Sequence, residues 1–203
     1  MKTKLIRIAI PACMLLAINA LAGDLDAIIE DCNGCHGDNG VSQWTDVPTI
    51  AGIDAFVHSD ALYIYRDNER PCAESEYRQG DTSKPATTMC AVVADFDDDT
   101  IDAVAEHYAA LPFVAAKQDF DADKAAAGKA IHDAQCDKCH SDGGSNPDDE
   151  ASILAGQWMG YLKTTFAQYA ADERDQPSSM RDKMAALSEA DTEALIHYYA
   201  SQQ

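Results

Sequence analysis

The sequence predicts an all-α protein built from two similar halves, and three observations support this prediction. The pentapeptide CNGCH at 32–36 returns as CDKCH at 136–140, so the chain repeats itself at an offset of 104 residues. Apolar residues recur at helical spacing in matching places of both halves. Alternating strand patterns are almost absent. A duplicated helical unit is the simplest explanation.

The repeat extends beyond the two pentapeptides. YRDNER at 65–70 lines up with YAADER at 169–174 at the same offset. Met89 precedes Tyr108 by nineteen residues, and near the end of the chain a second Met–Tyr pair has the same spacing. This second pair is Met180 and Tyr199, which gives an offset of 91. The change of offset places thirteen extra residues in the first half, near 72–88.

Six segments are expected to form helices, three in each half. Asp97 and Ser188 stand where the last helix of each half would be capped. The expected helices are 24–34, 54–66 and 97–110 in the first half, and 121–135, 157–171 and 189–201 in the second. The chain then divides into a first domain at 23–111, a linker at 112–122 and a second domain at 123–203.

The N-terminus has the pattern of a signal peptide over residues 1–22. Lys2, Lys4 and Arg7 precede an apolar stretch, and Ala20 and Ala22 form a small-x-small cleavage site. The alternative is a membrane anchor, but the apolar stretch is shorter than the roughly 20 residues that span a bilayer. We expect export to the periplasm, cleavage after Ala22, and no membrane span afterwards.

The chain of 203 residues is strongly acidic, with a formal net charge of −20. The part after residue 22 keeps 12 Lys and Arg against 35 Asp and Glu, which gives −23. Nucleic acid is excluded as a partner, because binding phosphates requires clustered basic residues. The acidity indicates either a solvated surface suited to a salty habitat or a field that attracts a basic partner.

Cys-x-x-Cys-His is the attachment motif of c-type haem, in which the two thiols bond the porphyrin and the histidine binds iron. Two motifs predict two covalently attached haem c groups. The predicted attachment residues are Cys32, Cys35, Cys136 and Cys139, and the predicted histidine ligands are His36 and His140. The alternatives are a zinc site and a redox dithiol. Zinc does not require a histidine after each pair, and a redox dithiol belongs in a βαβ context.

Methionine is the expected sixth ligand, as in electron-transfer haems. Met89 is the methionine that the first half offers. In the second half Met180 occupies the repeat position of Met89, with Met184 as its alternative, while Met159 and Met184 have the spacing of core residues. Because the protein then fills both axial positions, the sequence predicts one-electron transfer and no catalytic residues.

The remaining histidines and cysteines are assigned other roles. His58, His107, His132 and His197 do not match between the halves, so we expect none to bind iron, and His132 to be a surface or packing residue. Cys72 and Cys90 bracket the insertion and are candidates for a disulfide in an exported protein. The bond would close a loop of 17 intervening residues and contribute about 3 kcal/mol.

The general plan resembles dihaem class I cytochromes c of the cytochrome c4 type, which have two Cys-x-x-Cys-His domains with methionine ligands. The second half resembles the dihaem cytochrome subunit of flavocytochrome c sulfide dehydrogenase. The stretches that support the second resemblance are FDADKAAAGKAIHDAQCDKCHSDGG at 120–144, ILAGQWMGYL at 153–162, DERDQPSSMRDKM at 172–184 and the terminal YYASQQ. The first half matches mainly at the haem motif, Met89 and the last helix.

The resemblance implies two tandem class I cytochrome c domains, each wrapped around a covalently bound haem c. It also implies a periplasmic heterodimer in which an FAD-containing subunit oxidises sulfide, and the electrons pass through both haems to a downstream cytochrome. The family's iron ligands carry over to His36, Met89, His140 and Met180. The insertion and the pair Cys72 and Cys90 depart from the family pattern, so the resemblance does not extend to the surroundings of the first haem.

Two other functions are weighed against this subunit. The first is a free-standing dihaem carrier of the cytochrome c4 type, serving a terminal oxidase or another redox partner. The second is an enzyme with an open haem, such as a dihaem peroxidase, which the short chain and the two available methionines disfavour.

Overall fold

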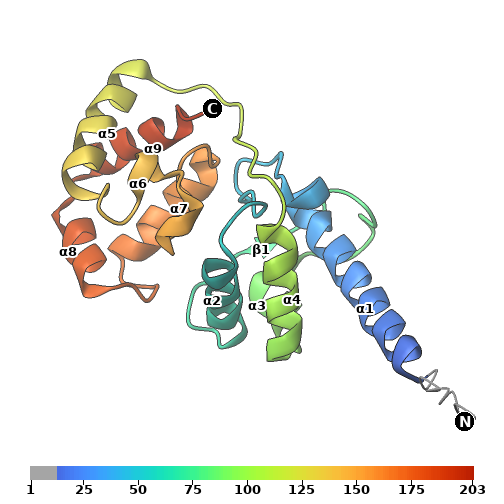
Figure 1. Ribbon diagram of the computed structural model, residues 1–203. Helices are drawn as coiled ribbons and strands as arrows, with labels where there is room; N and C mark the ends of the chain where they lie inside the picture. Colours follow the sequence, from blue (N-terminus) through green and yellow to red (C-terminus); the bar gives the residue numbers. More distant parts are fainter. Residues whose placement is uncertain (1–12) are drawn as a thin grey trace, which may run out of the picture.

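The computed structural model describes residues 13–203, with side chains from residue 25 onward. It is helical apart from one short hairpin (Figure 1). The predicted signal peptide at 1–22 lies outside the residues whose side chains are described, and it stays a prediction. None of the described helices is long and apolar enough to cross a bilayer.

The first half consists of three main helices with a hairpin and a short helix inserted before the last. Its elements are α1 (Cys13–His36), the 3-10 helix η1 (Asp38–Gly40), α2 (Ala55–Arg66), β1 (Glu74–Ser75), β2 (Thr87–Thr88), α3 (Met89–Val93) and α4 (Asp98–Ala109).

The second half repeats this order without the hairpin. Its elements are α5 (Ala122–Gln135), α6 (Ser141–Gly144), the 3-10 helix η2 (Pro147–Asp149), α7 (Met159–Ala170), α8 (Ser178–Ala186) and α9 (Glu189–Ala200).

All six predicted helices are present, and both predicted caps are confirmed. The Asp97 side chain accepts the Thr100 amide at the start of α4, and Ser188 forms a capping box with Asp191 at the start of α9. The sequence analysis missed α3 and α8. These are short helices, and each carries one of the predicted methionine ligands, Met89 on α3 and Met180 on α8.

Each half has its own hydrophobic core, with a tyrosine of its last helix at the centre. Tyr108 and Tyr199 are 0% and 1% exposed. Around them lie Ile29, Leu62, Val93, Ile101 and Val104 in the first core, and Leu162, Phe166, Met184, Leu195, Ile196 and Tyr198 in the second.

The loops after the two motifs fold in the same way. The amide of Gly52 donates to the Tyr108 carbonyl at 2.9 Å, and the amide of Gly156 donates to the Tyr199 carbonyl at 2.8 Å. Both glycines have φ near +70°, a left-handed conformation that favours glycine. A Cβ on Gly52 would lie 2.4 Å from the backbone nitrogen of Phe113. The tripeptides IAG at 50–52 and LAG at 154–156 therefore mark equivalent loops that end at a glycine.

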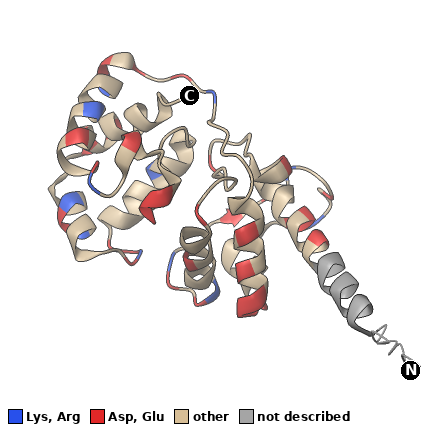
Figure 2. Ribbon diagram, viewed as in Figure 1, with Lys and Arg blue, Asp and Glu red and all other residues tan. Residues whose placement is uncertain are grey.

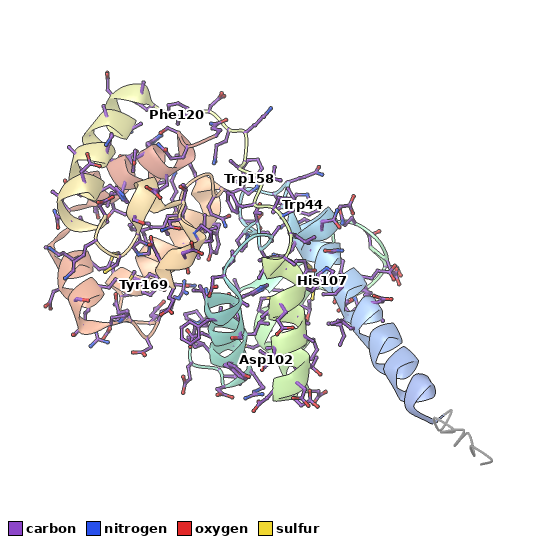
Figure 3. All side chains as sticks on the ribbon, viewed as in Figure 1. Trp44, Asp102, His107, Phe120, Trp158 and Tyr169 are labelled. Atoms are coloured by element: carbon purple, nitrogen blue, oxygen red, sulfur yellow. A yellow bond between two sulfur atoms is a disulfide. The ribbon has the colours of Figure 1, made fainter. Side chains whose placement is uncertain are left out.

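The two halves meet through hydrogen bonds between their loops. Gln157 is 1% exposed. Its side chain accepts the Thr49 amide at 3.0 Å and donates to the Thr49 carbonyl at 2.7 Å. The indole nitrogen of Trp158 donates to the Ser42 carbonyl at 2.9 Å. Figure 3 shows Trp158 and Trp44 together at this junction.

The connection at 112–122 runs along the second half. The amide group of Gln118 donates to the Gln157 carbonyl at 2.8 Å and accepts the Met159 amide at 2.9 Å. The segment therefore helps to hold Gln157 and the start of α7 in place, in addition to joining the halves.

Replacing Gln157 by leucine should lower the free energy of unfolding by about 2–4 kcal/mol, because both backbone groups of Thr49 would remain buried without partners. Chemical denaturation followed by circular dichroism measures the change. The matched control is Gln43→Leu, because Gln43 is exposed on a neighbouring loop. Equal stability of the two variants would show that the junction does not depend on Gln157.

Candidate functional site

The first Cys-x-x-Cys-His motif borders a cavity with about 620 Å³ of empty space, part of it open to solvent. Cys32, Cys35 and His36 reach the cavity from the end of α1, and Met89 reaches it from the first turn of α3. The three motif residues and a methionine that follows 53 residues after His36 therefore line one cavity. Most of the other lining side chains are apolar, among them Ile50, Leu62, Val92, Val93, Phe96 and Val104.

The ring of His36 is held by a backbone carbonyl. Its Nδ1 lies 3.0 Å from the Pro48 oxygen. A carbonyl oxygen only accepts hydrogen bonds, so Nδ1 carries the proton and donates it. The lone pair of Nε2 is then free to bind iron, as in metal sites where a second contact orients the histidine. Burial lowers the pKa of His36, which keeps the ring neutral.

The thiols of the first motif lie in surroundings that favour their protonated form. Burial, together with the Asp31 carboxylate, raises the pKa of Cys32 to about 12. Burial and Asp31 also raise the pKa of Cys35. A dithiol that exchanges disulfides reacts through a thiolate. The environment therefore disfavours the redox-dithiol alternative.

The second motif follows directly on α5 and forms a turn. The amide of His140 donates to the Cys136 carbonyl at 3.0 Å. Cys136 packs against the second core, whereas Cys139 is exposed. The two motifs share a sequence pattern but differ in local structure, since the first lies within a helix.

The ring of His140 is mostly buried, and burial lowers its pKa. The Ser152 carbonyl, at the repeat position of Pro48, counteracts part of this effect. Nδ1 of His140 is buried without a hydrogen-bond partner, so the Ser152 oxygen lies near the ring but outside hydrogen-bond geometry. The histidine of the second motif is thus near the equivalent backbone carbonyl, without the hydrogen bond that holds His36.

The methionines of the second half lie on two helices. Met180 on α8 is partly buried and packs against the second core, as does Cys136. Met184, one turn further along α8, is a member of that core and 9% exposed. Met159 on α7 also packs against it. The predicted packing roles of Met159 and Met184 agree with these positions, and Met180 as the iron ligand stays a prediction.

Two of the four remaining histidines are buried in the cores. His58 lines the first cavity, where burial and then His36 lower its pKa to about 4, and its Nδ1 has no hydrogen-bond partner. Leu162 occupies the repeat position of His58, so the second half has no histidine equivalent to it. The surface alternative for His132 is wrong, because this side chain is 0% exposed and its Nδ1 lies 3.0 Å from the Tyr199 hydroxyl.

Two arginines and three tyrosines form a cluster that the sequence analysis missed. The Arg70 guanidinium stacks on Tyr65 with 4.1 Å between its carbon and the ring centroid, and Arg174 stacks on Tyr169 at 4.3 Å. Desolvation pushes the pKa of Tyr161 upward. The charges of Arg70 and Arg174, together with polar contacts from Thr165 and Arg70, outweigh it, so this pKa is lowered and both cations act on the same phenol.

Both arginines have spare hydrogen-bond donors. Nε of Arg70 and Nη1 of Arg174 are buried without a partner, and neither residue forms an ion pair within the described part of the chain. A buried cation without an anion is costly. Each haem carries two propionate carboxylates, so these residues fit the edge of such a group. The signal for this cluster was the match of YRDNER with YAADER, which the sequence analysis used only as a marker of the repeat.

Cys72 and Cys90 are joined by a disulfide, with 5.9 Å between their Cα atoms. The bond closes the base of the insertion and lies next to Met89. Thr87 and Thr88 pair with Ser75 and Glu74 in the short hairpin just before it.

Comparison with known proteins bears first on the second half. The family model described as cytochrome c oxidase, cbb3-type, subunit III, matches residues 123–198. Among curated proteins, none matches the chain.

Three solved structures are similar over most of the chain. Cytochrome c4 from Acidithiobacillus ferrooxidans is 23% identical with a TM-score of 0.67, over 84% of this chain and 98% of that one. Reduced cytochrome c4 from Pseudomonas stutzeri is 21% identical with a TM-score of 0.70, over 90% and 98%. Thiosulfate dehydrogenase from Marichromatium purpuratum is 22% identical with a TM-score of 0.65, over 85% of this chain and 36% of that one. At these identities the likeness establishes a shared fold.

Replacing Cys72 and Cys90 together by alanine should cost about 3 kcal/mol of folding stability, because the open loop gains freedom in the unfolded chain. Urea unfolding measures the loss. The unmodified protein treated with a reductant provides the control and should fall to the same stability. A reductant without effect on the unmodified protein would contradict the prediction.

Proposed function

We propose that the chain is a c-type cytochrome that carries two covalently bound haems and transfers single electrons. The cavity that gathers Cys32, Cys35, His36 and Met89, with Nδ1 of His36 donating to Pro48, is the observation that supports this most directly. The second half repeats the motif, the carbonyl near the histidine, and a methionine on the following short helix. The likeness to two cytochrome c4 structures over 98% of their length supports the same function.

The residues of each half have separate tasks in this function. The cysteine pairs would bond the porphyrin, and His36 with Met89 and His140 with Met180 would bind the two irons. A haem held in this way supplies a one-electron couple between ferrous and ferric iron. Tyr108 and the apolar side chains around the first cavity would shield a haem held there from part of the solvent, and lower solvent exposure raises the reduction potential.

The arginine–tyrosine cluster connects the two sites in this proposal. Arg70 and Arg174 would bind the propionates of the two haems, and Tyr161 lies within reach of both charges. The residues that would hold the two haems would then lie in one cluster, around Tyr161. This arrangement favours exchange of electrons within the chain.

A second candidate, with the same chemistry, is the cytochrome subunit of a sulfur-oxidising enzyme, above all of a flavocytochrome c sulfide dehydrogenase with an FAD subunit. It is favoured by the resemblance of residues 120–203 and by the likeness to part of a thiosulfate dehydrogenase. The free-standing carrier is favoured by the coverage of whole cytochrome c4 chains. We propose the periplasm as the location in both cases.

Alanine at Met89 or at Met180 should each remove about half of the absorption near 695 nm that marks methionine bound to ferric haem, and should lower one reduction potential. Spectroscopy and potentiometric titration measure both effects. The matched control is Met184→Ala, which should leave the band intact. Loss of the band in the Met184 variant instead would assign the ligand to that residue, and a chain without covalently bound haem would refute the proposed function.

The partner is tested by purification from the native host. If the chain is the subunit of a sulfide dehydrogenase, it co-purifies with a flavoprotein, and sulfide reduces its haems only while that partner is present. If the chain is a free-standing carrier, it purifies alone and sulfide leaves it oxidised. Absorption spectra before and after adding sulfide distinguish these outcomes.

A further inference from the structure

The insertion at 72–88 lies directly on the first Cys-x-x-Cys-His motif. The amides of Arg78 and Gln79 donate to the carbonyl of Gly34, inside the motif, at 2.8 and 3.2 Å. A Cβ on Gly34 would lie 2.6 Å from the ring of Tyr77. The insertion therefore contacts the backbone between the two cysteines and requires a glycine there.

The insertion also reaches the second cysteine of this motif. Sγ of Cys35 lies 3.6 Å from the carbonyl oxygen of Glu76. Ser75, Tyr77 and Thr87 line the cavity beside it. One wall of the first site is thus made by a segment that the second half lacks.

Charged and polar side chains anchor the insertion around the motif. The Tyr77 hydroxyl donates to Asp31 at 3.0 Å, and Lys84 pairs with the same carboxylate. Arg78 binds both oxygens of Asp46 at 2.7 and 2.6 Å. In a chain with so few basic residues, two of them are used to hold this segment in place. The disulfide at its base fixes both ends.

The second motif has no such covering. Cys139 is exposed, as is Lys138 before it, and within the described residues Lys138 forms no ion pair. The two motifs therefore differ in access from solvent, although their chemistry is the same.

We infer, on the premise of the two-haem function proposed above, that the 72–88 insertion is a cover that closes the first motif's edge to redox proteins. The edge at Cys139 is then the one at which a protein donor or acceptor exchanges single electrons with the chain. The first site communicates with partners through the second. Because the insertion is present in only one half, electrons are exchanged with partners at only one of the two motifs.

The test compares chains that carry one haem each. Cys136→Ser with Cys139→Ser retains the first haem, and Cys32→Ser with Cys35→Ser retains the second. Each ferrous form is mixed with tris(phenanthroline)cobalt(III), a cationic complex that takes one electron from iron and becomes cobalt(II). The first-haem form should react on the order of tenfold more slowly, because restricted access lowers bimolecular rates. Equal rates in the two forms would overturn the inference.

Opening the cover should reduce the difference in rate between the two single-haem forms. Tyr77→Ala, Arg78→Ala and Lys84→Ala, combined in the first-haem form, should raise its rate towards that of the second-haem form. The control is Thr82→Ala with Ser83→Ala at the exposed tip of the same insertion, which should leave the rate unchanged. An unchanged rate in the opened variant, or an equal gain in the control, would also overturn the inference.

The reduction potentials of the chain with both haems provide a second test, which does not depend on whether the single-haem forms fold. Opening the cover exposes the first haem to water and should lower one of the two reduction potentials, because exposure stabilises ferric iron. If both reduction potentials of the opened variant are unchanged, the insertion does not cover the first haem. The haem count of the unmodified chain is measured first: fewer than two haems refutes the proposed function, whereas two haems with equal access refutes only the cover.

Discussion

The hydrogen bond from Nδ1 of His36 to the Pro48 carbonyl is the interaction around which the first half is arranged. It places a loop residue beneath the motif, so the chain after η1 must turn back across the end of α1. The Gly40 carbonyl braces that loop by accepting the Ile50 amide at 2.8 Å. The Gly52 amide then ties the end of the loop to α4. The hydrogen bond that fixes the tautomer of His36 therefore depends on the glycine turns, on Tyr108 and on α4 together.

The second half meets the same requirement with different side chains, which shows which parts of the unit are interchangeable. In the first half the Tyr108 hydroxyl donates to Asn33 at 2.9 Å. In the second half the hydroxyl of the equivalent tyrosine lies 3.0 Å from His132 Nδ1, so a buried histidine replaces the asparagine. The tyrosine is kept because the core packs around it, and its partner varies. The site therefore depends on where the hydroxyl is held and not on which residue holds it.

Periodicity predicts the long helices because each buries an apolar face, and the caps at Asp97 and Ser188 follow from local chemistry. It misses α3 and α8 because these helices are too short to show a period; tertiary packing determines them. The match of YRDNER with YAADER marked Arg70 and Arg174 as equivalent, but it could not show that both approach Tyr161, because loops from different halves converge only in the folded chain. The spacing of the motif predicted that Cys32, Cys35 and His36 act together, and the structure places all three at one cavity with Met89.

Charge connects these features to the surface. Arg70 and Arg174 are committed to the junction, and Arg78 and Lys84 to the insertion, so few basic groups remain to offset the acidic ones. Figure 2 shows acidic residues along α4, which carries Asp98, Asp99, Asp102 and Glu106. Such a field steers a basic partner at low ionic strength, but its reach falls to about 8 Å at 0.15 M salt and about 3 Å at 1 M. The two explanations of the acidity therefore exclude each other in practice, because a surface suited to a salty habitat cannot also attract a partner from a distance.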